Sequence, residues 1–185
     1  MDVVMDLLLR FSGVLAIFCA WFMVTLPALR SGINGMNSTI TEAMVKKRRI
    51  RKVIGGGLIV GALLQIAFLG YLTKRFGFGW FYPGSLLYLS TNIATILVAL
   101  FPAQKFPNIH RFCADYYFLV NPISLVFIGL SIAHDNYYIY IFSIILVIIY
   151  FMGFFWQLIK FKINALMEMW AFLTLSVWTL VLTLV

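Results

Sequence analysis

The stretch Tyr137–Ile159, YYIYIFSIILVIIYFMGFFWQLI, decides the fold class of this chain. It contains no Asp, Glu, Lys or Arg. A helix that crosses about 30 Å of hydrocarbon at 1.5 Å per residue needs about 20 apolar residues. Lipid offers no hydrogen-bond partners, so a spanning segment must satisfy its backbone groups internally. The stretch therefore predicts a transmembrane helix.

Further stretches of similar length and apolarity lie on both sides of it. The predicted spans are approximately Leu7–Leu29, Val53–Thr73, Tyr82–Pro102, Phe112–Ala133, Tyr137–Ile159 and Ile163–Val185. Short polar turns between the last three spans predict antiparallel neighbours. A membrane β-barrel would instead need alternating segments of about ten residues. We predict an all-α polytopic membrane protein, a single domain over residues 1–185 with six transmembrane helices in one bundle.

The composition supports this class. The 185 residues are 63% hydrophobic and 11% charged, and the mean hydropathy is +1.00. Soluble domains carry about a quarter charged residues, which excludes an ordinary soluble enzyme. The chain holds 2 cysteines and 2 histidines, too few for a disulfide framework or a histidine-rich metal centre. We expect no metal and no cofactor.

The connection after the first span, residues 30–52, is the longest. Thr39-Ile40-Thr41-Glu42 has the pattern of a capping box and predicts a helix that starts near Ile40. Glu42 precedes Lys46 by one helical turn, the favoured order for an ion pair. No helix breaker separates this segment from the second span, so we expect the second helix to extend into the cytoplasm.

Basic residues indicate the orientation. The loops after the first, third and fifth spans carry most of the Lys and Arg, whereas the second loop carries Lys74 and Arg75. Under the positive-inside rule, residues 30–52 are cytoplasmic and both termini are outside the cell membrane. Six basic residues form a dense cluster there: Lys46, Lys47, Arg48, Arg49, Arg51 and Lys52. They are either a topological anchor or a site for anionic lipid headgroups. The sequence has no basic domain with interleaved aromatic residues, so we do not expect it to bind nucleic acid.

Small and polar residues mark helix surfaces that should avoid lipid. Gly57 and Gly61 form a GxxxG pair, which allows close packing inside the bundle or against a membrane protein partner or a second copy. In the third span Tyr88 and Asn92 belong to one polar stripe, and Asn121 belongs to another in the fourth. Interhelical hydrogen bonds would explain both stripes, and a ligand pathway between these helices is the alternative reading.

Acidic residues near the predicted membrane boundary are the remaining candidates. Asp115 follows Arg111 by four residues, which predicts an ion pair, or a headgroup or proton site together with His110 and Lys105. Glu168 lies in the sixth span, about 8 Å from its start at 1.5 Å per residue. It must reach the interface, carry a proton or accept a partner from another helix.

One segment resembles a known group. Ser90–Pro102, followed by Phe106-Pro107 and His110, resembles six-span bacterial membrane proteins of unknown function related to the Frag/DRAM/Sfk group. In that group a Phe-Pro ends the third span and a histidine opens the fourth; Phe101-Pro102 and His110 match. Ala103-Gln104-Lys105 stand where an acidic residue often follows. The resemblance implies six spans and associations with membrane lipid or sensing, with no assigned reaction.

The main hypothesis is a non-enzymatic protein that binds or transports a small molecule or lipid in a cavity between helices. Its candidate residues are Tyr88, Asn92, His110, Arg111, Asp115, Asn121 and Glu168. One alternative is a structural or regulatory subunit of a membrane complex. The other is an intramembrane enzyme that uses an acidic residue, although no nucleophile elbow, zinc motif or phosphate loop is present. Membrane lipids are the expected partners in every case.

Overall fold

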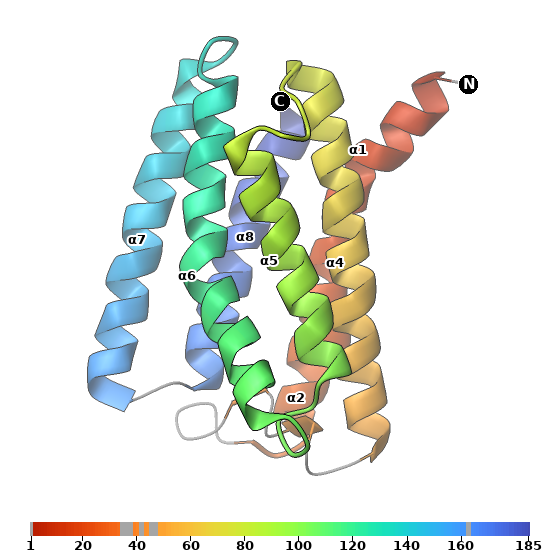
Figure 1. The fold of residues 1–185 in the computed structure, drawn as a ribbon, viewed down its shortest axis with the longest axis vertical. Helices are drawn as coiled ribbons and strands as arrows, with labels where there is room; N and C mark the ends of the chain where they lie inside the picture. The colour runs from red at the N-terminus through yellow and green to blue at the C-terminus, as the bar shows by residue number, and fades with distance from the viewer. Residues whose placement is uncertain (1, 34–38, 41–42, 45–47, 162–163) are drawn as a thin grey trace.

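The computed structural model describes residues 2–33, 39–40, 43–44, 48–161 and 164–185. The chain there is helical and contains no strand. Six helical stretches in the described residues are long and apolar enough to cross a membrane. This confirms the predicted all-α, six-span architecture. Figure 1 shows the spans side by side as one elongated bundle.

The spans run alternately up and down in chain order. Their elements are α1 (Asp2–Phe18), η1 (Cys19–Thr25) and α2 (Leu26–Arg30) for the first span, then α4 (Arg48–Phe76), α5 (Pro83–Leu100), α6 (Pro107–Ile132), α7 (Tyr137–Phe161) and α8 (Ala165–Leu184). Each span contacts the next, and α1 also contacts α8. The bundle is therefore a closed ring of helices whose inner faces meet around one interior.

The first span is continuous but changes helix type. Residues Cys19–Thr25 form a π-helix between α1 and α2. Pro27, at the start of α2, has no backbone N–H to donate to the preceding turn. The Leu26 N–H donates to the Trp21 carbonyl, and the Thr25 hydroxyl donates to the Ala20 carbonyl over 2.8 Å. These two bonds satisfy the Trp21 and Ala20 carbonyls in the widened turn that precedes Pro27.

The cytoplasmic extension of the second helix is not confirmed. Helix α4 is described from Arg48 onward, and Thr41, Glu42, Lys46 and Lys47 lie outside the described residues. Ile40, Ala43 and Met44 are buried against Val24, Ile54 and Ala165. These residues of the long connection therefore pack on the end of the bundle.

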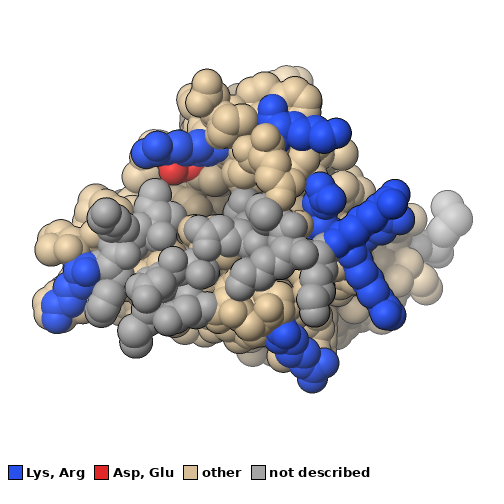
Figure 2. Space-filling view, turned by 90° about the horizontal axis from the view of Figure 1, so that it is seen from below, with Lys and Arg blue, Asp and Glu red and all other residues tan. Residues whose placement is uncertain are grey.

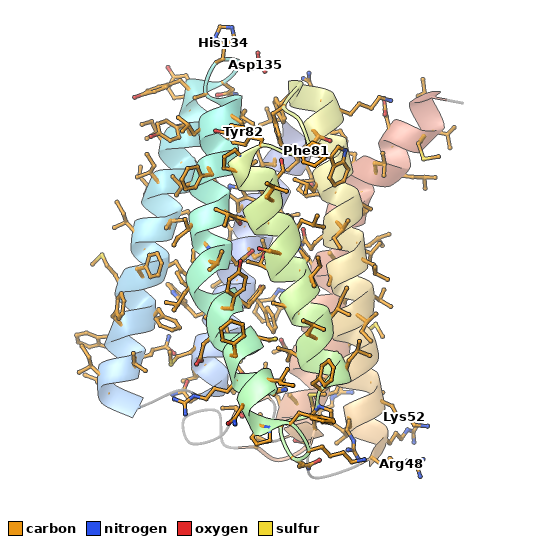
Figure 3. The ribbon with its side chains drawn as sticks, viewed as in Figure 1. Arg48, Lys52, Phe81, Tyr82, His134 and Asp135 are labelled. Carbon is orange, nitrogen blue, oxygen red and sulfur yellow. The ribbon has the colours of Figure 1, made fainter. Side chains whose placement is uncertain are left out.

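Charged residues lie at both ends of the bundle. Figure 3 shows Phe81, Tyr82, His134 and Asp135 at one end and Arg48 and Lys52 at the other. Arg10 belongs to the first of these ends, because its Nε donates to the Thr183 carbonyl over 2.6 Å. Lys74 pairs with Asp6 at the same end over 2.6 Å. We call the end that carries Arg48 and Lys52 the basic end.

The largest cluster of buried side chains lies between α4, α5, α6, α7 and α8. It includes Phe68, Tyr88, Leu125, Ile128 and Trp178, each at most 1% exposed. Pro122 interrupts the hydrogen bonding of α6, as its ring leaves the Phe118 carbonyl without its usual helical donor. The Tyr150 hydroxyl of α7 donates to that carbonyl over 2.9 Å. Helix α6 thus continues past Pro122, and the Phe118 carbonyl is satisfied by a side chain of the neighbouring helix α7.

Candidate functional site

The interior of the ring is not completely filled. Two adjoining hollows of about 40 Å³ and 60 Å³ lie between η1, α4, α5, α6 and α8. They share five lining residues: Val24, Leu58, Thr95, Tyr117 and Phe172. We call the first the upper chamber and the second, nearer the basic end, the lower chamber. Their lining comes from five of the six spans, all but α7, and from the long connection after the first span.

Asn92 lines the upper chamber together with Gln65. Both side chains are buried. The Asn92 amide donates to the Tyr88 carbonyl over 2.8 Å, and the Tyr88 hydroxyl donates to the Gln65 side-chain oxygen. Tyr88 is completely buried beside the chamber. The polar stripe of α5 therefore faces protein, and a glutamine of α4 completes it.

Asn121 lies away from the two chambers. It lines a separate hollow of about 10 Å³ with Pro122, Tyr117 and Tyr150. The Thr91 hydroxyl donates to the Asn121 side-chain oxygen over 3.3 Å, which joins α5 to α6. A volume this small holds about one water molecule. The structure thus gives Asn121 a helix-joining contact next to the proline, while Tyr117 reaches both this hollow and the chambers.

Glu168 lines the lower chamber and is 9% exposed. Asn164 caps α8, since its side-chain oxygen accepts the Met167 N–H over 3.0 Å and so fixes the helix start. This places Glu168 in the first turn, where the helix dipole favours a negative charge. Its Oε2 accepts the backbone N–H of Ile40 over 2.5 Å. The sequence allowed a partner from another helix; the structure shows a backbone donor from the long connection between the first two spans.

His110, Arg111 and Asp115 do not line the chambers. Arg111 Nε and Asp115 Oδ2 are 3.6 Å apart, and both side chains are well exposed, at 79% and 45%. This is the predicted ion pair. His110 is buried, and its Nδ1 lies 2.9 Å from the Phe101 carbonyl, across the α5–α6 turn. The histidine therefore joins the two helix ends, and the ion pair lies on the surface of α6.

Gly57 and Gly61 face the interior of the ring. A Cβ atom on Gly57 would lie 2.6 Å from the Met23 Cβ, and one on Gly61 would lie 3.4 Å from the Cys19 Cβ. Both neighbours belong to η1, so these glycines allow α4 and η1 to approach closely. They also line the upper chamber. The GxxxG pair thus contributes to packing inside the bundle.

The basic cluster is partly described. Arg48, Arg49 and Lys52 are exposed, whereas Arg51 is half-buried and places its Nη1 3.4 Å from the Gln104 Oε1. Lys46 and Lys47 lie outside the described residues. Figure 2 shows blue side chains at several places around the rim of this end. Exposed basic residues of other segments are Arg30, Lys105, Arg111 and Lys160. The positive charge of this end therefore comes from several loops.

Several residues that build the cavity were not predicted from the sequence. Gln65 is a polar residue in a largely apolar span. Such a residue is expected to face the interior of the bundle, so the sequence did contain a signal for it. Trp21 donates from Nε1 to the Ser176 hydroxyl over 3.1 Å, and Ser176 lines the upper chamber. Ile40 and Met44 line the lower chamber from the long connection. No local pattern marks the last two, because the contacts join segments far apart in sequence.

The fold and the chambers define a multi-pass helical membrane protein with a partly polar internal cavity. Comparison with protein-family models, with curated proteins and with solved structures finds no match for the chain. Within the described residues, no three His, Cys, Asp or Glu side chains gather closely enough to hold a metal ion. The site is therefore interpreted from its own residues.

Proposed function

We propose that this protein binds a small molecule inside the membrane, in the two chambers between η1, α4, α5, α6 and α8. The observation that carries the proposal is that Glu168, a buried carboxylate, and Asn92, a buried amide, line adjoining hollows whose lining is mostly apolar. Ligand sites are mostly apolar cavities with a few placed polar groups. The proposed role is binding or transport rather than catalysis.

Gly57 and Gly61 face the interior of the bundle, which favours this proposal over a role as a subunit of a membrane complex. Gly57 and Gly61 contact η1 of the same chain, so they do not supply a small-residue face for a membrane partner. An enzyme that used Asp115 would need that carboxylate near a bound substrate, and Asp115 instead pairs with Arg111 on the surface. Membrane lipids remain the proposed partners of the exposed basic residues, which can approach anionic headgroups.

Filling the lower chamber tests the binding proposal. Ala114 lines this chamber from α6, and Leu119 on the same helix is 47% exposed. Ala114→Phe should remove most of any small molecule that stays with the purified protein, because the added ring occupies the chamber. Leu119→Phe should retain it. Native mass spectrometry of both variants and the unaltered protein measures the retained mass.

Equal retention by the two variants would contradict cavity binding, since lipids held on the outer surface do not depend on Ala114. A phospholipid mass that disappears only in Ala114→Phe would identify a lipid as the occupant. Both variants add aromatic bulk to α6, so a general effect on helix formation would appear in both.

We further propose that the basic end faces the cytoplasm and that both termini lie outside. Replacing the six basic residues between Lys46 and Lys52 with glutamine should raise the fraction of chains in inverted or mixed orientation several-fold, because the main positive-inside signal is lost. Accessibility of an N-terminal tag to a membrane-impermeant reagent on whole cells measures this. Replacing Lys74 and Arg75 is the control and should leave the tag outside. An unchanged tag in both variants would refute the anchoring role of the cluster.

A further inference from the structure

The upper chamber contains polar groups but no charged group. Its lining includes the side chains of Asn92 and Gln65, which are 6% and 5% exposed. None of its described lining residues is Asp, Glu, Lys, Arg or His. From these two side chains in an uncharged hollow, we propose that the upper chamber binds a primary amide on a small apolar body. Such a head group is uncharged and both donates and accepts hydrogen bonds. The inference rests on the proposed function and names its ligand class.

Asn92 supplies a hydrogen-bond acceptor. Its side-chain nitrogen donates to the Tyr88 carbonyl over 2.8 Å. A carbonyl oxygen can only accept, so this bond fixes the orientation of the Asn92 side chain and leaves its oxygen for another partner. That oxygen accepts no hydrogen bond from the described residues. Because a buried acceptor without a donor is costly, a donor from a bound molecule would stabilise this arrangement.

Gln65 supplies a hydrogen-bond donor. The Tyr88 hydroxyl donates to the Gln65 side-chain oxygen. The side-chain N–H groups of Gln65 remain, and they make no hydrogen bond to the described residues. The hydroxyls of Thr95 and Ser176, which also line the chamber, already donate to carbonyls of their own helices over 3.0 Å and 2.6 Å. The groups left for a ligand thus include an acceptor on α5 and a donor on α4.

A primary amide complements this pair of groups. Its N–H groups can donate to the Asn92 oxygen, and its carbonyl oxygen can accept from Gln65. A methyl ketone of the same shape accepts but cannot donate, so it leaves the Asn92 oxygen unpaired, and sites built to hydrogen-bond reject such analogues. A carboxylate or an amidinium brings a charge that no described lining residue of the upper chamber opposes, and burial of such a charge is costly.

The size of the chamber limits the head group. A hollow of about 40 Å³ has room for about three water-sized groups. The apolar body of the ligand can extend along Val24, Leu58 and Phe172, which line both chambers. Any water that occupies the chamber is displaced favourably only by a head group that reproduces its hydrogen bonds. A compact amide is thus the ligand that this space and these groups accommodate.

Four probes of the same shape test the inference. Isobutyramide, isopropyl methyl ketone, isobutyrate and isobutyramidinium differ only in the groups on the head carbon, so they separate hydrogen bonding from charge. Binding to the purified full chain is measured by calorimetry and by the shift in thermal unfolding. We expect isobutyramide to bind at least about tenfold more tightly than the ketone and than either charged probe. This comparison needs no variant, so it stands even if a substitution impairs folding.

Substitutions then locate the preference. Asn92→Leu keeps the approximate size of the side chain but removes the acceptor, so isobutyramide affinity should fall to that of the ketone. Unchanged ketone affinity would show that the variant still folds around the chamber. Asn121→Leu is the matched control, because Asn121 is also a buried asparagine but lines a separate hollow, and this variant should retain the full preference for the amide.

The outcomes separate this inference from the proposed function. Equal affinity for amide and ketone in the unaltered protein would overturn the amide preference and leave cavity binding in place. Tighter binding of either charged probe, or an amide preference that persists in Asn92→Leu, would also overturn it. If none of the four probes binds, the amide inference fails, and the retained mass in Ala114→Phe and Leu119→Phe decides the proposed function by itself.

Discussion

Trp178→Ala should be among the most destabilising single substitutions in this protein, at about 3–5 kcal/mol by comparison with aromatic-to-alanine changes in protein cores. Trp178 is completely buried, and its ring centroid lies 6.0 Å from that of Tyr88. Its Nε1 donates to the Ser143 hydroxyl over 3.0 Å. The substitution therefore removes packing between α8, α5 and α7 at once.

In a membrane this effect comes from lost packing and hydrogen bonding rather than from transfer of the ring out of water. Lipid is as apolar as a helix surface, so the bundle is stabilised by close packing and hydrogen bonds rather than by exclusion of water. A void at Trp178 leaves its neighbours without partner atoms, which forfeits those contacts. Gly129 brings α6 close to Ser143, since a Cβ there would lie 2.7 Å from the Ser143 Oγ. The neighbouring helices are already in close contact and have little room to collapse into the void.

Thermal stability in detergent, followed by loss of the monodisperse peak on size-exclusion chromatography, measures the prediction. Trp156→Ala is the control, because Trp156 is 62% exposed on α7 and contacts Lys160. Trp178→Phe keeps most of the bulk and should cost about 1 kcal/mol or less through the lost hydrogen bond. Similar melting temperatures for Trp178→Ala and Trp156→Ala would contradict the packing role of Trp178.

The spans were predictable because the thickness of the bilayer sets the length of a spanning helix, and that length can be read from one apolar segment of the sequence. The segment 137–159 was expected as one helix, and α7 covers Tyr137–Phe161. The ion pair of Arg111 and Asp115 was equally predictable, since residues four apart on a helix meet wherever the helix lies. Both features depend on local sequence alone.

Contacts between distant segments were not predictable in the same way. The polar stripes of α5 and α6 were expected to avoid lipid, but the sequence did not indicate which hollow each would meet: Asn92 lines the upper chamber and Asn121 lines a hollow beside Pro122. Which polar groups meet depends on the rotation of each helix about its axis, and packing with all neighbours sets that rotation. One partner of Glu168 is Ile40, which is far away in sequence and donates from its backbone. Because every residue except proline has a backbone N–H, the residue type at position 40 does not indicate that it is a donor.

The glycines of α4 offer a sharper test of how the ring is held together. Gly57→Ala should lower stability by about 1–3 kcal/mol, the usual cost of overpacking. The new Cβ would lie 2.6 Å from the Met23 Cβ and 3.0 Å from the Val24 Cγ2, so α4 and η1 must separate. Neither atom is the end of a long flexible side chain, so a simple rotamer change does not relieve the contact.

Gly56→Ala is the matched control, because nothing lies within 4 Å of a Cβ at Gly56. Both variants replace glycine with alanine in the same turn of α4, so both gain the same helix propensity, about 1 kcal/mol at most. The difference between their melting temperatures therefore reports packing against η1. If Gly56→Ala were the more harmful change, the outward face of α4 would be an interface with another molecule. A subunit role would then replace internal packing as the explanation for the glycine-rich turn.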